Sequence, residues 1–443
     1  MRTRANRSEP RYTQLACVLA LLAFAAAGCD RAQPPGEESN ATAAHSTQVP
    51  EQAGGISADH ESNLIDQLMA IGYLRGTRHD SRSGVTIHDR ERAYPGYNLY
   101  VSGHAPEATL IDMDGGVVHR WQFAYEDAFG PLAKPNDNAG WWRRVVAFPN
   151  GDLLAIYEGL GLIKIDKHSK LIWKSELDAH HDLEVQPRGE IYVLTRKAHV
   201  VPRIDPTRPI LEDFVTVLGP TGEFRKEWSL LEAFEGSRFE DLVNPDFASG
   251  NGDLFHTNTI AVLPGFGAQH DRAFRPGNLL VSMNRMGVVA VVSPRNGKVI
   301  WVRRTAVVGQ HDPKLLPNGN MLLFTNNMNG DASVVEEFHP KQGDVAWSYR
   351  GSDTQPFYSK YLGAAERMPN GNTLITESEG GRAFEVTPKG EIVWEFYNPH
   401  RTGEGSDDAG EEGFIATLPE VVRLPGGIFL GWADGPAAPH LRR

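Results

Sequence analysis

Residues 143–177 read RRVVAFPNGDLLAIYEGLGLIKIDKHSKLIWKSEL and contain one complete unit of an internal repeat. The unit consists of a short apolar strand, a Pro-x-Gly turn, two further strands, a second turn and a last strand that carries a tryptophan. Strands rich in Val, Ile and Leu that are bounded by Gly, Asn and Asp indicate antiparallel β-structure. A single four-stranded sheet has two apolar faces and does not bury them alone, so such units must stack.

The repeat recurs along the chain, with clear further copies at 309–351 and 362–399. Six prolines occupy the first turn of a unit: Pro149, Pro187, Pro264, Pro317, Pro369 and Pro425. Six tryptophans occupy last strands: Trp121, Trp173, Trp228, Trp301, Trp347 and Trp394. The series begins with a tryptophan strand and ends with a proline turn, so the two ends of the chain complete one unit together.

These counts predict an all-β fold, a six-bladed β-propeller with four-stranded blades over residues 95–443. The ring is closed by strands from the N- and C-terminal ends of this region. We expect the six tryptophans to lie in the core between blades. Two stacked sheets or a β-solenoid are the alternatives that the repeat leaves open.

The N-terminal residues have the pattern of an export signal. Residues 1–28 combine a basic start with the apolar run LACVLALLAFAAAG and resemble a lipoprotein signal peptide that is cleaved before Cys29. We therefore expect lipid on the Cys29 thiol and anchoring to a membrane of the cell envelope, facing the periplasm. Asp30 resembles a signal for retention at the inner membrane. The alternative is an ordinary signal peptide followed by an incidental cysteine.

The residues after Cys29 suggest a tether and a lead-in. Residues 29–62 are rich in Pro, Gly, Ser, Thr and Ala, which predicts a disordered tether. Residues 63–94 form the expected lead-in, and apolar spacing within 61–76 predicts one short helix in it. Only two cysteines are present, so we expect no disulfide. The formal net charge of −12 argues against a nucleic-acid partner.

Polar residues recur at one distance from the turn prolines. His181 and His311 each stand six residues before such a proline, and Asn258 holds the same position in a third blade, with His256 two residues earlier. The first strand of a blade lines the axis of a propeller, so this position reaches one mouth of the channel. The same position holds Arg143 and Gly363 in two other blades. The ends of second strands reach the same mouth, which adds Arg285, Asn326, Asn327, Thr376 and Glu377.

The sequence thus predicts a pocket of hydrogen-bond donors formed by His181, His256, His311, Asn258 and Arg285. Imidazole, amide and guanidinium groups suit a small oxyanion such as sulfate or phosphate. One reading is group transfer through a histidine nucleophile. A three-histidine metal site is a second reading, although an arginine beside a dication opposes it. A polar plug of the channel is a third.

The segments that carry these residues resemble a known family. The stretches YNLYVSGHAPEATLIDMDGGVVHRW, HHDLEV, FHTNTIAVLP, NLLVSMNR and GQHDPKLLPNGN are similar to the bacterial arylsulfotransferases that do not use PAPS. The resemblance spans roughly residues 90–433. It implies a six-bladed propeller, no cofactor, and ping-pong transfer of a sulfuryl group from a phenolic sulfate ester to a phenolic acceptor through a sulfohistidine.

The resemblance also implies roles for individual residues. His311 in GQH corresponds to the nucleophile, His256 and Asn258 match the His-x-Asn element, and His181 matches a further sulfate-binding histidine. Arg285 resembles the sulfate-binding arginine, although SMNR displaces it by one residue from the common spacing. A non-catalytic, lipid-anchored propeller that binds an anion or a protein, and a metal-dependent hydrolase, are the alternative functions.

Overall fold

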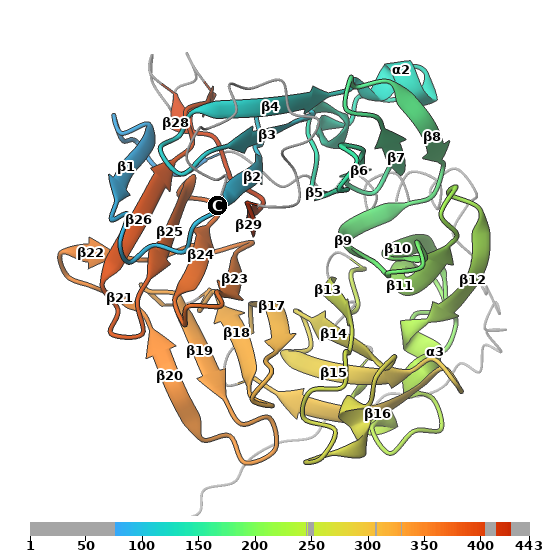
Figure 1. The fold of residues 1–443 in the computed structure, drawn as a ribbon. Helices are drawn as coiled ribbons and strands as arrows, with labels where there is room; N and C mark the ends of the chain where they lie inside the picture. Colours follow the sequence, from blue (N-terminus) through green and yellow to red (C-terminus); the bar gives the residue numbers. More distant parts are fainter. Residues whose placement is uncertain are drawn as a thin grey trace, which may run out of the picture. The chain divides into compact units, whose positions relative to one another are not determined.

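A computed structural model of the chain describes residues 76–244, 246, 252–305, 308–328, 330–403 and 413–426. In this part of the chain, six antiparallel sheets form a ring around a central axis (Figure 1). The chain is therefore a six-bladed β-propeller, as the repeat predicts. The signal peptide with Cys29, the tether and the expected helix lie outside the described residues, apart from Gly76 at the end of that helix.

Each blade runs from an inner strand beside the axis to an outer strand at the rim (Figure 1). Blades 1 to 3 consist of β5 (Arg144–Ala147), β6 (Leu153–Tyr157), β7 (Gly161–Ile165) and β8 (Leu171–Ser175); β9 (Ala179–Val185), β10 (Ile191–Val200), β11 (Pro209–Leu218) and β12 (Phe224–Ser229); and β13 (Thr257–Val262), β14 (Leu279–Met283), β15 (Val288–Ser293) and β16 (Lys298–Arg304).

Blades 4 to 6 complete the ring. They consist of β17 (Gln310–Leu315), β18 (Met321–Thr325), β19 (Val334–Phe338) and β20 (Val345–Tyr349); β23 (Ala364–Arg367), β24 (Thr373–Glu377), β25 (Arg382–Val386) and β26 (Ile392–Tyr397); and β29 (Val421–Leu424), β2 (Tyr97–Val101), β3 (Glu107–Ile111) and β4 (Val117–Gln122). In blade 6 the C-terminal β29 is the inner strand and pairs with the N-terminal β2. The predicted closure of the ring by both ends is confirmed.

One strand was not expected from the sequence. β1 (Gly84–His88) lies in the segment 63–94, which we expected to be helical or irregular, and it pairs antiparallel with β26. Blade 5 therefore has five strands rather than four. The repeat signals do not mark β1, because it has neither a turn proline nor a tryptophan. It covers an outer edge that β26 would otherwise leave open, and covering an open edge prevents pairing with other chains.

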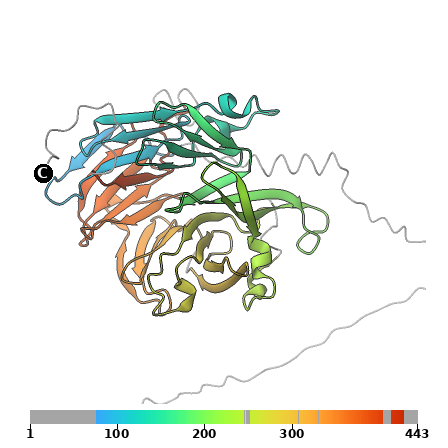
Figure 2. The same cartoon turned by 45° about the vertical axis from the view of Figure 1, so that its right-hand side comes forward.

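Short elements connect the blades. They are α2 (Tyr125–Phe129), α3 (Leu230–Phe234), η1 (Asp137–Gly140), η2 (Glu240–Leu242), η4 (Arg272–Phe274), β21 (Gly351–Ser352), β22 (Gln355–Pro356), β27 (Arg401–Thr402) and β28 (Phe414–Ile415). Figure 2 shows the long β10–β11 hairpin, in green, extending past its neighbours. Within the described ranges, the helices are too short and too polar for any of them to cross a bilayer.

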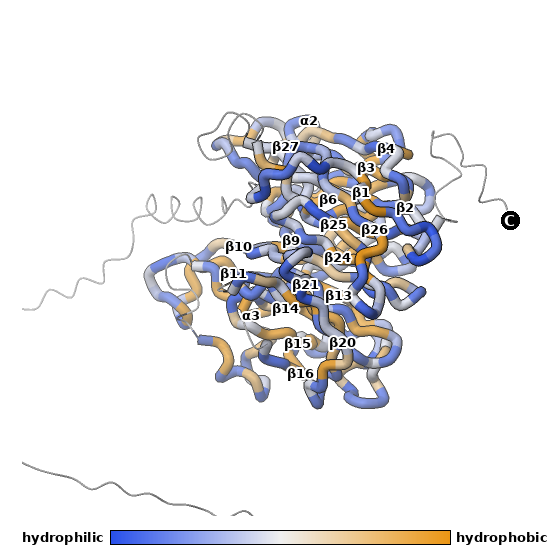
Figure 3. The backbone as a smooth tube through the Cα atoms, turned by 90° about the vertical axis from the view of Figure 1, so that its left-hand side faces the viewer, coloured by the Kyte–Doolittle hydropathy of each residue, from blue (hydrophilic) through white to orange (hydrophobic). Residues whose placement is uncertain are grey.

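The apolar core is divided among the junctions between blades. In the described residues, each junction has its own cluster of buried side chains, so neighbouring sheets bury each other's faces. Figure 3 shows hydrophobic segments along the strands and hydrophilic segments in the connections. Burial of apolar area is the main stabilising term in such stacking, at about 25 cal/mol per Å².

The tryptophans join blades at the rim. Trp121 Nε1 donates to the carbonyl of Gly151 in blade 1 at 2.9 Å, and Trp394 Nε1 donates to the carbonyl of Met113 in blade 6 at 3.0 Å. Trp347 Nε1 donates in the same way to Pro388 in blade 5, at 2.9 Å. The expected place of these tryptophans between blades is therefore confirmed, with a directional hydrogen bond added to the apolar contact.

The proline turns fix where each inner strand ends. In blade 1 the Gly151 N–H donates to the Phe148 carbonyl at 2.9 Å, and Gly151 has a φ of +91°. Gly319 repeats this geometry in blade 4, with a bond to Leu316 and a φ of +84°. Only glycine adopts such a φ at little cost, which explains the Pro-x-Gly pattern. Counting back from the proline therefore gives the same height along the axis in every blade.

In each blade, a residue four or five positions before the turn proline forms a polar bond to a neighbouring blade near the axis. In blade 1 this residue is Arg144, which pairs with Asp182 of blade 2, Nε to Oδ1, at 2.7 Å, and with Glu420 of blade 6. The second oxygen of Asp182 accepts the Ile260 N–H of blade 3 at 2.9 Å. Glu420, Arg144 and Asp182 thus form a chain of polar bonds that crosses three consecutive junctions, from blade 6 through blades 1 and 2 to blade 3.

The remaining junctions have equivalent bonds. The Asp312 N–H donates to Thr259 Oγ1 of blade 3 at 3.1 Å, and the Asp312 carboxylate accepts the Ala365 N–H of blade 5 at 2.9 Å. Between blades 5 and 6, the Val421 N–H donates to Thr376 Oγ1 at 3.2 Å. Every junction around the ring therefore has at least one polar bond beside the axis. We call these bonds the axial belt.

Loss of the Asp312 carboxylate tests the axial belt. In Asp312→Ala, the Ala365 N–H loses its acceptor and the Lys314 ammonium loses a partner 2.9 Å away. We expect the free energy of unfolding to fall by about 2–3 kcal/mol, measured by urea denaturation. The exposed Asp344 serves as a control, and Asp344→Ala should change it by less than about 0.5 kcal/mol. Equal effects of the two substitutions would contradict this role.

Candidate active site

A cavity at the axis is lined by the residues that precede the turn prolines by six positions. All six blades contribute this residue: Arg143, His181, Asn258, His311, Gly363 and Pro419. Their neighbours Arg144, Thr259, Asp312 and Ala364 complete the lining. The repeat register therefore brings His181, His311 and Asn258 to one small volume, as the sequence predicts. It also brings a buried arginine, Arg143, to which the sequence analysis assigns no role.

Three residues at the site have a left-handed backbone. His181, His256 and Asp312 have φ values of +54°, +51° and +51°. Such values cost roughly 1–3 kcal/mol for residues other than glycine, and they cluster at functional sites. The surrounding side chains hold each of them by its own N–H. The acceptors are Glu158 Oε2 for His181 at 2.8 Å, Asp253 Oδ1 for His256 at 3.0 Å, and Thr259 Oγ1 for Asp312 at 3.1 Å.

The inner strands are irregular at the same height. The pairing register shifts between Val193 and Thr195 opposite β9, between Thr257 and Thr259 in β13, and between His311 and Lys314 in β17. A bulge places an extra residue on one strand and redirects its side chains. His256 precedes β13 and Asn258 lies at the shift, so strict alternation along the strand does not determine how these two side chains lie relative to each other.

His311 is a buried, oriented imidazole. Its Nδ1 lies 2.6 Å from Asn326 Oδ1. The Asn326 amide nitrogen donates to the carbonyls of Ser359, at 2.8 Å, and Leu362, at 2.5 Å, so its oxygen must face His311. His311 Nδ1 is then the donor, and Nε2 bears the lone pair. Burial, together with the positive charge of Arg143, lowers the pKa of His311 to about 3. At neutral pH this imidazole is uncharged and nucleophilic.

His181 is also neutral but has different partners. Its Nδ1 lies 2.9 Å from Nδ1 of His180 and 3.4 Å from Glu158 Oε1. Burial and then the charge of Arg143 lower the pKa of His181 well below its ordinary value. The pKa of His180 is lowered by burial in the same way. His181 therefore contributes a hydrogen-bonding group to the cavity without adding a charge.

His256 is the histidine that keeps a proton. Its Nδ1 lies 2.5 Å from Asp253 Oδ2, and its ring centroid lies 5.0 Å from that of His181. Burial opposes the charged form, but the Asp253 carboxylate outweighs burial and raises the pKa of His256 above its ordinary value. The pKa of His256 is thus shifted in the opposite direction from those of His181 and His311 because their surroundings differ. His256 is suited to donate a proton and His311 to act as a nucleophile.

Two arginines lie near the histidines in different places. Arg143 is 5% exposed, lines the cavity and lowers the pKa of both His181 and His311. Arg285 lies beside Asp253, with its Nε 3.8 Å from Oδ2 and 35% of its side chain exposed. Arg285 is thus next to the His256–Asp253 pair and is not one of the residues that line the axial cavity.

The other second-strand ends named from the sequence have separate places. Thr376 belongs to the axial belt, and Glu377 pairs with Arg78 at 2.5 Å and with Arg382 at 3.2 Å. The Asn327 amide donates to the Ala332 carbonyl. Only Asn326 among these ends has a hydrogen bond to a cavity histidine within the described residues.

Two functional neighbours were missed by the sequence reasoning. One is Glu158, which accepts the His181 backbone N–H, and the other is Arg196, which lies 3.7 Å from Glu158. Each stands nine residues after a turn proline. Asn326 stands at the same distance in blade 4. Counting nine residues forward from each turn proline, which also reaches Asn326, would have identified Glu158 and Arg196.

The charge balance favours an anion over a metal ion at this site. Glu158, His180 and His181 place one ligand atom each within 4.8 Å of one another. However, the Arg196 and Arg143 guanidinium groups lie 3.7 and 4.0 Å from the Glu158 carboxylate and offset its charge. A dication would meet two cations at this position, whereas an oxyanion in the axial cavity would meet Arg143 and Asn258 as donors.

Comparisons with known proteins identify one family. A family model described as "Arylsulfotransferase (ASST)" matches residues 144–399, which include β5 to β26 and all five predicted site residues. No curated protein matches the chain significantly.

Among solved structures, the chain is similar to a Bacteroides caccae protein of unknown function, at 15% identity and a TM-score of 0.46, with 73% of this chain and 98% of that chain covered. It is also similar to the Cps50 (Swd1) β-propeller domain of Myceliophteria thermophila, at 11% identity and a TM-score of 0.41, covering 74% and 94%. A catalytically inactive virginiamycin B lyase from Staphylococcus aureus has 11% identity and a TM-score of 0.39, covering 73% and 88%.

Proposed function

Since the chain belongs to the arylsulfotransferase family, we propose that it transfers a sulfuryl group from a phenolic sulfate ester to a phenolic acceptor by a ping-pong mechanism. The covalent carrier in this proposal is His311. The observation that carries the assignment is the hydrogen bond from His311 Nδ1 to Asn326, which leaves a neutral Nε2 lone pair at the axial cavity.

In the first half-reaction, His311 Nε2 attacks the sulfur of the donor. The N–S bond forms, the S–O bond to the aryl group breaks, and the leaving phenolate takes a proton from His256. Arg143, Asn258 and His181 bind the sulfuryl oxygens, whose charge is stabilised by donors fixed in a buried site. The low pKa of His311 matters because only the uncharged imidazole is a nucleophile.

In the second half-reaction, the acceptor phenol gives its proton to the now neutral His256 and its oxygen attacks sulfur. The N–S bond breaks, and His311 returns to its neutral form while His256 regains its charge. Phenols suit both steps because their pKa near 10 is close enough to that of a histidine for assisted proton transfer. The Asp253 carboxylate supports this cycle by stabilising charged His256.

The alternative functions have less support. A metal-dependent hydrolase conflicts with the two arginines beside Glu158. A non-catalytic propeller that only binds an anion or a protein needs neither an oriented neutral His311 nor a proton-bearing His256. The assay of His311 separates this reading from catalysis.

Loss of the His311 imidazole should abolish transfer. We expect His311→Ala to lower acceptor-dependent release of 4-nitrophenol from 4-nitrophenyl sulfate by at least about 10³-fold, because the covalent route is lost. Intact mass spectrometry of the wild-type protein with excess donor should show the added mass of one SO₃ group, absent in the variant. His168→Ala, in an exposed turn, is the control. Release that His311→Ala does not alter would refute the assignment.

The role of His256 predicts dependence on the leaving group. In His256→Gln, transfer from phenyl sulfate should fall about 10²-fold more than transfer from 4-nitrophenyl sulfate, whose phenolate leaves without a proton. Because the pKa of His256 is raised, wild-type transfer from phenyl sulfate should persist above pH 6.5 and decline as pH rises through that pKa. Asp253→Asn should move the decline to lower pH. Equal losses for both donors would argue against an acid at this position.

The two arginines give a matched pair of variants. We expect Arg143→Gln to lower kcat/KM by about 10²-fold or more, since Arg143 lines the cavity. Arg285→Gln should lower kcat/KM by less and should act through Asp253, whose pKa the Arg285 charge lowers. A larger loss in Arg285→Gln than in Arg143→Gln would favour Arg285 as the sulfate-binding arginine.

We also propose that the protein is exported and held at the cell envelope by lipid on Cys29, on the basis of the AAGCD sequence at 26–30. Cys29→Ser should move the protein from the membrane fraction to the soluble fraction on cell fractionation. Retention of the variant in the membrane fraction would argue for another anchor.

A further inference from the structure

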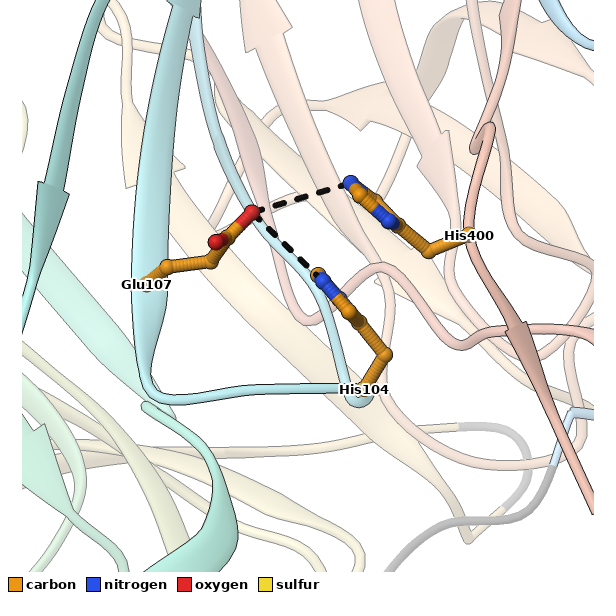
Figure 4. Close-up of side chains that lie close together, drawn as sticks. All are labelled: His104, Glu107 and His400. Carbon is orange, nitrogen blue, oxygen red and sulfur yellow. Dashed lines mark ion pairs between the residues drawn. The ribbon is translucent and has the colours of Figure 1, made fainter. Parts of the chain in front are cut away.

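A second cluster of potential ligands lies between blades 5 and 6. It consists of His104 in the β2–β3 turn, Glu107 at the start of β3, and His400 after β26 (Figure 4). Figure 4 shows the Glu107 carboxylate facing the edges of both imidazoles. The cluster contributes nothing to the proposed sulfuryl transfer, and it brings together two segments almost 300 residues apart in the chain.

The distances between its atoms fit one metal ion. Glu107 Oε1 lies 3.5 Å from His104 Nε2 and 3.6 Å from His400 Nε2. A tetrahedral Zn²⁺ with bonds of about 2.0–2.1 Å separates its ligand atoms by about 3.3–3.4 Å. The two rings lie parallel, with centroids 3.5 Å apart and an angle of 8° between their planes. Their Nε2 lone pairs therefore lie in parallel planes, and binding of one ion by both nitrogens requires at least one ring to rotate substantially out of the stack.

Two of the three ligand atoms are buried without a hydrogen bond. Glu107 Oε1 and His400 Nε2 are inaccessible to solvent and lack a hydrogen-bond partner, because the nearest polar atoms are too distant. Buried polar atoms nearly always have a partner, so each such exception needs an explanation. A cation between the carboxylate and the two imidazoles would satisfy both atoms at once.

The other ring nitrogen of His104 is held by a polar chain. His104 Nδ1 lies 2.8 Å from Ser102 Oγ, which accepts a hydrogen bond from the Asn398 amide at 2.8 Å. With Nδ1 as the donor to Ser102, Nε2 bears the lone pair that a metal needs. Support of this kind for the second nitrogen is usual for histidines that bind metals. The chain also crosses the junction, since Asn398 belongs to blade 5.

The charges around this cluster differ from those around Glu158. Glu107 has no arginine among its ion-pair partners in the described residues, which are the two histidines alone. The cations that act on the two histidines are Arg120, whose side chain is exposed and screened by solvent, and Arg401, which is half-buried and acts on His400. Glu107 also lines a surface cavity with Pro106 and Phe123, through which an ion can approach.

We propose that His104, Glu107 and His400 bind one Zn²⁺ ion that links blade 5 to blade 6. Two imidazoles and one carboxylate are a common three-ligand set for zinc, with the fourth position left to water. The ion links blade 5 to blade 6. Blade 6 is the blade in which β29 pairs with β2 and closes the ring. Its expected effect is stabilisation of the closed ring.

The test uses the full-length chain without a histidine tag, stripped with chelator and titrated with ZnCl₂. We expect one Zn²⁺ per chain to remain after buffer exchange, measured by elemental mass spectrometry. At 100 times the dissociation constant, Tm should rise by about 3–5 °C. His104→Gln, Glu107→Gln and His400→Gln should each lose both effects. His168→Gln, at an exposed histidine outside the cluster, should keep them.

Three outcomes would overturn the proposal. The first is that the wild-type chain retains no zinc, and the second is that all three variants retain it. The third is that only a further variant, His181→Gln, loses the zinc, which would place the ion at the Glu158 cluster. If one variant does not fold, as judged by circular dichroism, the other two decide. The readouts are metal content and Tm, so the result does not depend on sulfuryl transfer.

Discussion

The fixed distance between each turn proline and the axial belt is the constraint on which the rest of the structure depends. The Pro-x-Gly turn ends the inner strand at one face, and residues four or five positions earlier bond to a neighbouring blade at the other. Asp182 and Asp312 show the principle most clearly, because each accepts a backbone N–H from the next blade. An inner strand that is fixed both at its turn and at the axial belt cannot slip by one residue without breaking these bonds. Such a slip would also move every side chain of the strand to the opposite face of the sheet.

The same constraint gives the two residues of each His-Asp pair different roles, one structural and one chemical. In 181–182 and 311–312, the aspartate belongs to the belt and the histidine to the cavity. The belt supplies the rigidity that a left-handed backbone at His181 and Asp312 requires, since such strain persists only where neighbours hold it. Side-chain acceptors on Glu158 and Thr259 complete that support. Catalytic groups placed this way need little reorganisation when substrate binds.

The sequence predicts those features that repeat and misses those that occur once. Blade number, ring closure and the convergence of His181, Asn258 and His311 follow from a count that recurs six times. β1 has no counterpart in other blades, so no repeat could reveal it. The bulges at the tops of β9, β13 and β17 redirect side chains by local backbone changes that a period of two cannot represent. The place of Arg285 relative to Arg143 depends on such local geometry.

The charge states of the histidines arise from their partners rather than from the repeat. His256 and His311 are the same residue type, yet a carboxylate faces one and a neutral amide faces the other. A carboxylate favours the imidazolium, while the Asn326 amide orients the ring and leaves burial to favour the neutral form. Two side chains of identical chemistry thereby differ in charge at one pH. Replacing Asp253 by a neutral residue would remove the interaction that raises the pKa of His256, and replacing Asn326 would remove the partner that orients His311. Asp253 and Asn326 are therefore as decisive for the chemistry as the histidines themselves.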